Sequence, residues 1–312
     1  MAEKPLVYVH GAGEQPKAAD LKARLDGVLF GGASDFSRLG YYADVRWKKP
    51  GPGQGAAAGS AGRARRVRAV RGAATEPSPE EAAERIVRAT LATPGRPHRV
   101  GAAPAGRIKA ADRRAAQDLA EQLFRNADRV ARRSSARTPG LGIGLPEPIF
   151  RRLVGFFASD VIDYLYAGYA ERMRAPVRAA LLADPAPSVV VAHSLGTIIT
   201  YDVLSEPAFA GRPKALLVTL GSPLGIDNVQ ARLRDRAGRP NPVPKLLREW
   251  DNFADRFDPV ALDATLRDAF RPPKDFAVDE AVNNRGALNH ELEGYLRIGI
   301  VRSLIRNAVG AE

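Results

Sequence analysis

The feature that most constrains this chain is a short apolar run that passes through a turn of small residues into a helical pattern. Residues 188–199 read Ser-Val-Val-Val-Ala-His-Ser-Leu-Gly-Thr-Ile-Ile. A strand followed at once by a helix holds the residue at the turn, Ser194, in a strained backbone conformation. Neighbouring backbone crowds such a turn, so small residues are needed at the positions of Ala192 and Gly196. The pattern predicts a serine that stands exposed at the edge of a sheet.

Similar apolar runs recur along the chain and alternate with amphipathic patterns. We expect strands at residues 6–9, 41–47, 188–192, 215–220, 250–253 and 276–282. We expect helices from Pro16 through Leu29, one or two within 150–182, and others at 195–204, after Pro259 and at 290–305. Short strands alternating with helices predict the α/β class, with a mostly parallel central sheet and helices on both faces.

Positive charge is concentrated in one segment. The chain has a net charge of +12, and residues 46–137 hold 21 Lys and Arg against 8 Asp and Glu. Residues 50–148 are rich in Ala, Gly and Arg and contain few large apolar side chains. We interpret them as a basic insertion, partly helical at 78–93 and 110–133, partly disordered, and without a core of its own.

Other chemistries are excluded by composition. The chain has no cysteine, so disulfides, a thiolate nucleophile and a Cys-ligated metal are ruled out. It has no run of about 18 uncharged apolar residues, the length that a membrane-spanning helix needs. We therefore expect a cytoplasmic protein with no transmembrane segment.

The turn resembles the nucleophile elbow of the α/β-hydrolase superfamily. The family pattern Gly-x-Ser-x-Gly appears here as Ala192-His193-Ser194-Leu195-Gly196, with Ala in place of the first Gly. The resemblance implies that Ser194 is the nucleophile. Because Leu195 opens the following helix, its backbone N–H is placed to stabilise an oxyanion.

A second part of the resemblance lies directly after the first apolar run. Family members have there a loop whose backbone N–H completes the oxyanion hole, and this chain has His10-Gly11-Ala12-Gly13. The resemblance implies that the N–H of Ala12 is that donor and that the two glycines allow a close approach. A phosphate-binding loop is the alternative, but neither nucleotide-binding glycine pattern is met.

The general base follows largely by elimination, because the chain has only four histidines. His10 lies in the glycine loop, His193 lies in the elbow, and His98 lies in the basic segment. His290 remains, and it follows the last expected strand, where the family has its catalytic histidine.

The resemblance also implies a carboxylate between Ser194 and His290 in the sequence. Residues 250–260 read Trp-Asp-Asn-Phe-Ala-Asp-Arg-Phe-Asp-Pro-Val. We select Asp258, because the Asp-Pro-Val step resembles the acid loop of the family. Asp255 and Asp251 stay as alternatives.

The chain as a whole is similar to the lipase and esterase branch, which includes relatives of the GPI inositol deacylases. The resemblance implies one α/β-hydrolase domain over residues 1–312 that cleaves a small-molecule or lipid carboxylic ester through an acyl-enzyme, with no metal or organic cofactor. An amidase or peptidase, an acyltransferase and a non-catalytic binding protein stay open.

Three interpretations of the insertion at 50–148 stay open. Insertions in this superfamily often form a lid or cap over the active site. The closely spaced Arg63, Arg65, Arg66, Arg68 and Arg71 could contact an anionic surface. The segment could also be solvated and have no partner. Because the excess positive charge lies in this segment, deleting residues 50–139 should leave a folded core and abolish any salt-sensitive binding to anionic vesicles or nucleic acid.

Overall fold

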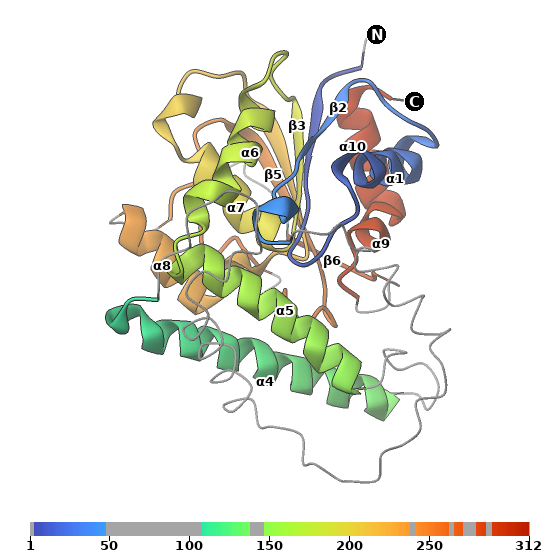
Figure 1. Cartoon of the computed structure of the whole chain (residues 1–312). Helices are drawn as coiled ribbons and strands as arrows, with labels where there is room; N and C mark the ends of the chain where they lie inside the picture. Colours follow the sequence, from blue (N-terminus) through green and yellow to red (C-terminus); the bar gives the residue numbers. More distant parts are fainter. Residues whose placement is uncertain are drawn as a thin grey trace.

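The structure, a computed structural model, describes residues 3–47, 108–137, 147–237, 241–261, 265–270, 279–284 and 289–311. Six strands form one parallel sheet in the order β2-β1-β3-β4-β5-β6 (Figure 1). The strands are β1 (Leu6–Val9), β2 (Ser37–Gly40), β3 (Val189–His193), β4 (Ala215–Leu220), β5 (Leu247–Asp255) and β6 (Asp279–Val282). This confirms the α/β class and the parallel sheet.

Helices cover both faces of the sheet (Figure 1). One face packs against α1 (Ala18–Phe30), α9 (Leu292–Leu296) and α10 (Gly299–Val309). The other face packs against α6 (Ala170–Leu182), α7 (Leu195–Leu204) and α8 (Asp227–Ala237). Alternate strand residues face opposite sides, so Leu6 and Tyr8 belong to the first core, and Val7 and Val9 to the second.

Two further helices, α4 (Arg113–Arg137) and α5 (Glu147–Tyr166), lie beyond the end of the sheet (Figure 1). Both pack into the core on the α6–α8 side. The helix expected at 110–133 is therefore present as α4, and its apolar side chains belong to the core of the domain. The helix expected at 78–93, the linker before it and His98 lie outside the described residues.

The strand expected at residues 41–47 is wrong. Ser37–Gly40 pairs with β1 instead, and Ala43–Val45 forms the 3₁₀ helix η1. The N–H of Tyr42 donates to Nε2 of His10 at 3.1 Å, and the two rings stack with centroids 4.1 Å apart. Because the Tyr42 N–H donates to a side chain, it is not available for a hydrogen bond to a neighbouring strand. Strand β2 therefore does not extend through Tyr42.

Two predictions for the C-terminal third also need correction. No helix is present in residues 259–261 or 265–270, although the Asp258 side chain accepts the N–H groups of Val260 and Ala261 as an N-cap residue does. The single helix expected at 290–305 is two helices, α9 and α10. The strand expected at 276–282 is described only over Asp279–Val282.

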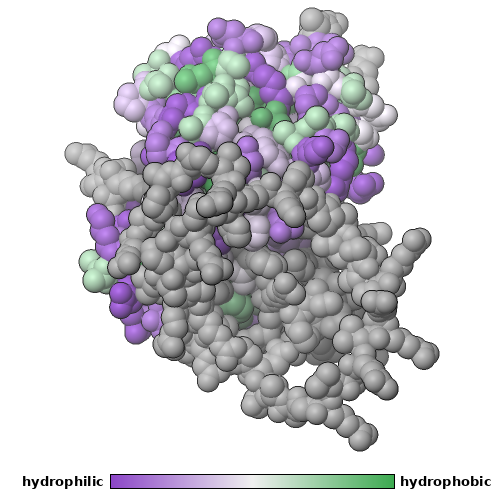
Figure 2. Space-filling model, in the orientation of Figure 1, coloured by the Kyte–Doolittle hydropathy of each residue, from purple (hydrophilic) through white to green (hydrophobic). Residues whose placement is uncertain are grey.

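The described surface has few exposed large hydrophobic side chains. Hydrophilic and hydrophobic residues are interspersed over the coloured part of Figure 2. Among the described residues, Ile300 is the one large hydrophobic side chain that is exposed. No helix within the described ranges is long and apolar enough to cross a membrane.

Candidate active site

Ser194 occupies the turn between β3 and α7 with φ 55° and ψ −131°, a left-handed conformation that is strained for any residue but glycine. Its N–H donates to the carbonyl of Leu220 at 3.0 Å, and its carbonyl accepts the Thr197 N–H at 2.9 Å and hydroxyl at 2.7 Å. These bonds fix the strained turn. The N–H of Leu195 is one of the first of α7, which find no acceptor within the helix.

The small residues of the elbow are required by close backbone approach. A Cβ on Gly196 would overlap the carbonyl oxygen of His10 and lie 2.8 Å from that of Val9. A Cβ on Gly11 would lie 2.8 Å from the Cβ of Ser194. The glycine loop and the elbow are therefore in direct contact. Ala192 is fully buried and belongs to the core on the α6–α8 side.

Ser194, His290 and Asp258 form one hydrogen-bonded line. Nε2 of His290 lies 2.8 Å from Oγ of Ser194, and Nδ1 lies 2.7 Å from Oδ2 of Asp258. An ionised carboxylate can only accept, so Nδ1 carries the ring proton and Nε2 accepts from the serine hydroxyl. This is the tautomer that a general base needs.

The three side chains are buried, at 0%, 3% and 1% exposure in that order. The expectation of an exposed serine is therefore wrong, because His290 and the glycine loop close over the Ser194 side chain. The Phe157 ring on α5 meets the His290 ring edge-on, with centroids 6.1 Å apart. Helix α5 thus packs against His290.

The alternatives to Asp258 have other contacts. Asp255 accepts the N–H groups of Phe257 at 2.7 Å and Asn284 at 2.6 Å and the amide of Asn289 at 3.0 Å. It therefore ties together the loops that carry Asp258 and His290. Desolvation raises the pKa of Asp255, whereas these hydrogen bonds lower it. Asp251 lies within β5 and pairs with Val218 of β4.

The two other described histidines hold the site in place. Nδ1 of His10 donates to the carbonyl of Gly11 at 2.7 Å, and Nε2 of His193 donates to the carbonyl of His290 at 2.7 Å. Burial lowers the pKa of His10 to about 4 and that of His193 well below its ordinary value. Both rings are neutral near pH 7, so they act as hydrogen-bonding supports.

The glycine loop is anchored to α5. Gly13 has φ 87°, and its N–H donates to Oδ2 of Asp160 at 2.6 Å. Asp160 is 2% exposed, forms an ion pair with Arg46 and accepts from the indole of Trp47 at 3.2 Å. Burial raises its pKa, whereas Arg46 and the Gly13 N–H lower it. Ala12, the predicted oxyanion donor, is buried in the same loop.

Three residues that contact the site were not identified from the sequence: Asp160, Gly221 and Tyr295. Asp160 is a carboxylate among the apolar residues of the C-terminal half of α5, a pattern that can be seen in the sequence. Gly221 follows β4 with φ 55°, and a Cβ there would lie 2.6 Å from Oδ2 of Asp258. The Tyr295 hydroxyl donates to that same oxygen at 2.7 Å. Nothing in the local sequence distinguishes Tyr295 from an ordinary core residue of a helix.

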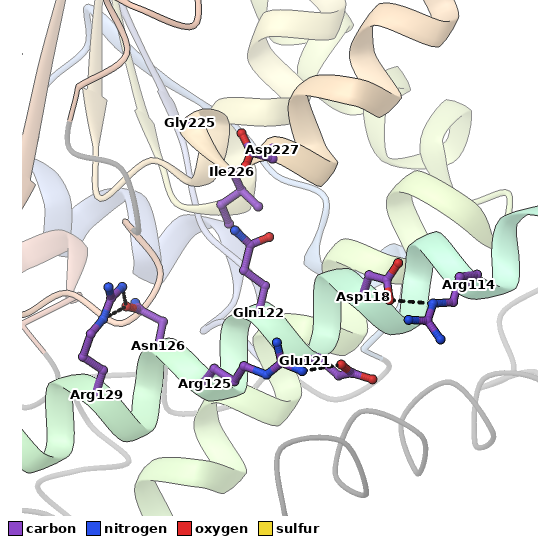
Figure 3. A pocket seen from close by; sticks show the side chains of 10 residues that line it. All are labelled: Arg114, Asp118, Glu121, Gln122, Arg125, Asn126, Arg129, Gly225, Ile226 and Asp227. Atoms are coloured by element: carbon purple, nitrogen blue, oxygen red, sulfur yellow. Dashed lines mark hydrogen bonds and ion pairs between the residues drawn. The ribbon is translucent and has the colours of Figure 1, made fainter.

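Two sizeable grooves in the described part of the chain have linings that do not include Ser194, His290 or Asp258. One, of about 810 Å³, separates α4 from the start of α8 (Figure 3). Its cationic side chains are paired: Arg114 with Asp118, Arg125 with Glu121, and Arg129 with Asn126. The groove is therefore mixed in charge. The arginine cluster considered for anionic contacts lies outside the described residues, as does most of the basic segment.

No cluster of His, Asp and Glu side chains in the described ranges could hold a metal ion. Comparison with family models, curated proteins and solved structures gives no match.

Proposed function

We propose that this chain is a serine hydrolase of the α/β-hydrolase type that cleaves a carboxylic ester of a small molecule or lipid. The observation that carries the proposal is the hydrogen-bonded line from Ser194 through His290 to Asp258. It stands at a strained strand-to-helix turn, beside a glycine loop. A structural serine would have no need of a strained backbone, a neutral imidazole acceptor and a buried carboxylate together.

The acylation step follows from this geometry. As Oγ of Ser194 bonds to the ester carbonyl carbon, its proton passes to Nε2 of His290, and the carbonyl π electrons move to oxygen. Asp258 holds the imidazole and offsets the positive charge that develops on it. The N–H groups of Leu195 and Ala12 are the proposed oxyanion donors. The tetrahedral intermediate then expels the alcohol, which takes the proton from His290.

Deacylation repeats the sequence with water. His290 removes a proton from the water that attacks the acyl carbon, and the intermediate collapses to release the acid and restore the Ser194 hydroxyl. Because the three residues act as a unit, loss of any one should remove most of the rate.

The test combines labelling with a substrate screen. A fluorophosphonate probe should label the native protein, and p-nitrophenyl esters of increasing chain length should be hydrolysed faster than members of a peptidase panel. Ser194→Ala and His290→Ala should each lower kcat by roughly 10³-fold or more, and the double variant should be little worse. Asp258→Asn should lose less than Ser194→Ala, because nucleophile and base remain.

Asp255→Asn is the matched control, since it alters a neighbouring buried carboxylate that does not contact His290. It should lower the stability of the two loops, while its effect on kcat should be small. An unlabelled protein would favour the non-catalytic binding protein, and faster cleavage of peptides or amides would favour the amidase. A fully active His290→Ala variant would remove the triad assignment.

A further inference from the structure

Tyr295 lies on α9, which begins two residues after His290, and its side chain is fully buried. Its hydroxyl has two partners at the site. It lies 2.7 Å from Oδ2 of Asp258, and it accepts the backbone N–H of Asp255 at 3.0 Å. The same tyrosine therefore joins the end of β5 to the carboxylate of the triad.

The direction of these hydrogen bonds is fixed by their partners. A backbone N–H can only donate, so the hydroxyl oxygen accepts from Asp255, and the hydroxyl proton is left for the carboxylate of Asp258. Burial, with the nearby charge of Asp258, raises the pKa of Tyr295 well above its ordinary value. The hydroxyl therefore keeps its proton at any pH at which the enzyme would work.

Both oxygens of Asp258 are fully engaged. Oδ1 accepts the N–H of Val260 at 2.8 Å and that of Ala261 at 3.2 Å. Oδ2 is shared between the Tyr295 hydroxyl and Nδ1 of His290, both at 2.7 Å. A donor on the same oxygen fixes its position and draws electron density away from its bond to the imidazole.

We propose that Tyr295 is a positioning residue of the triad, which acts on His290 through Oδ2 of Asp258; this inference rests on the proposed function. The hydroxyl holds Oδ2 in line with Nδ1 of His290. It also limits how strongly the carboxylate stabilises the protonated imidazole. Besides Asp258, the His290 ring contacts His193, which stays neutral, the Ser194 hydroxyl and the apolar Phe157 ring.

Tyr295→Phe removes the hydroxyl and keeps the ring. With a p-nitrophenyl ester, kcat should fall roughly tenfold while KM changes less than about twofold, because the hydroxyl does not contact substrate. The acid limb of the kcat–pH profile should move upward by about half a unit, because a carboxylate relieved of one donor stabilises the imidazolium better. In an Asp258→Asn background, the same substitution should lower kcat by less than about twofold.

Tyr8→Phe is the matched control. Tyr8 is also fully buried, and its hydroxyl donates to the buried Asp26 at 3.0 Å, away from the triad. It should lower thermal stability as Tyr295→Phe does, and it should leave kcat and the pH profile unchanged. Should Tyr295→Phe fail to fold, 3-fluorotyrosine at position 295 keeps the ring and strengthens the donor. It should move the acid limb downward.

Two results would overturn the inference while leaving the proposed function intact. One is an active Tyr295→Phe enzyme with an unmoved pH profile. The other is an equal loss of kcat in the native and Asp258→Asn backgrounds, since Tyr295 would then support only the fold. A native protein that neither hydrolyses esters nor reacts with fluorophosphonate would overturn the proposed function, and this inference with it.

Discussion

At the scale of single residues, His10 and His193 couple the stability of the fold to pH. Both are buried and neutral, with pKa values lowered by desolvation, to about 4 for His10. In the unfolded chain each returns to about 6.5. Between these values the unfolded state binds more protons than the folded state, so the free energy of unfolding must fall as pH falls.

We therefore predict that stability decreases from pH 7.5 to pH 5.5, by about 1 kcal/mol for His10 and a similar amount for His193. Urea unfolding at both pH values measures the difference, and His10→Asn should remove about half of it. Asp160 and Asp255, whose pKa values are raised, have the opposite effect: as the pH falls they take up protons more readily in the folded state, which increases stability. The comparison therefore stops at pH 5.5. An unchanged slope in His10→Asn would contradict the argument.

The line of Ser194, His290 and Asp258 could be predicted because the elbow has a local signature and the chain has few histidines. Asp258 could be chosen over Asp255 only by resemblance. The two carboxylates differ in their hydrogen-bond partners, and the sequence does not show these partners. Tyr295 could not be predicted. Its role depends on contact with Oδ2 of Asp258, which lies in the loop after β5. In the sequence, Tyr295 looks like any other residue on the apolar face of a short helix.

At the scale of elements, the contact between β1 and α7 depends on Gly196. We predict that Gly196→Ala destabilises the protein by about 2 kcal/mol or more, because the added Cβ meets backbone carbonyls of Val9 and His10 that cannot move aside. Gly27→Ala is the control. That glycine is exposed within α1 and has open space around it, so alanine should stabilise by about 0.5–1 kcal/mol. Chemical denaturation measures both, and a tolerated Gly196→Ala would contradict the close approach.

Elements with their own periodicity could be predicted, as β3, α7 and β4 illustrate. Those decided by tertiary contacts could not. Residues 41–47 have the aromatic and β-branched character of a strand, yet His10 takes the N–H of Tyr42. The strand formed instead at Ser37–Gly40, which has no apolar alternation and is selected by its pairing with β1. Residues 259–261 and 265–270 contain no helix, even though the Asp258 carboxylate accepts the N–H groups of Val260 and Ala261 as an N-cap does, so local capping did not determine the element.

At the scale of the whole molecule, α4 shows how a charged composition can hide a core helix. Its buried residues recur at helical spacing along one face: Ala116, Leu119, Ala120, Leu123, Phe124, Ala127 and Val130. The arginines of α4 occupy other positions. The high content of Lys and Arg over residues 46–137 therefore concealed the row of apolar residues on one face of the helix. Asn126 adds a polar link, since its amide donates to the carbonyl of Pro259 at 2.8 Å, beside the loop of Asp258.

Because α4 belongs to the core, we predict that Leu123→Ala lowers the free energy of unfolding by about 2–5 kcal/mol, the range for a cavity left by a buried leucine. Arg114→Ala, on the exposed face of the same helix, should change stability by less than about 0.5 kcal/mol. Urea unfolding at one pH compares the two variants.

Deletion of residues 50–139, which we expected to leave a folded core, should instead expose the face of α5 that packs on α4 and cause unfolding or aggregation. A cooperative, monomeric deletion variant together with a neutral Leu123→Ala would show that α4 is a peripheral cap that the domain can lose.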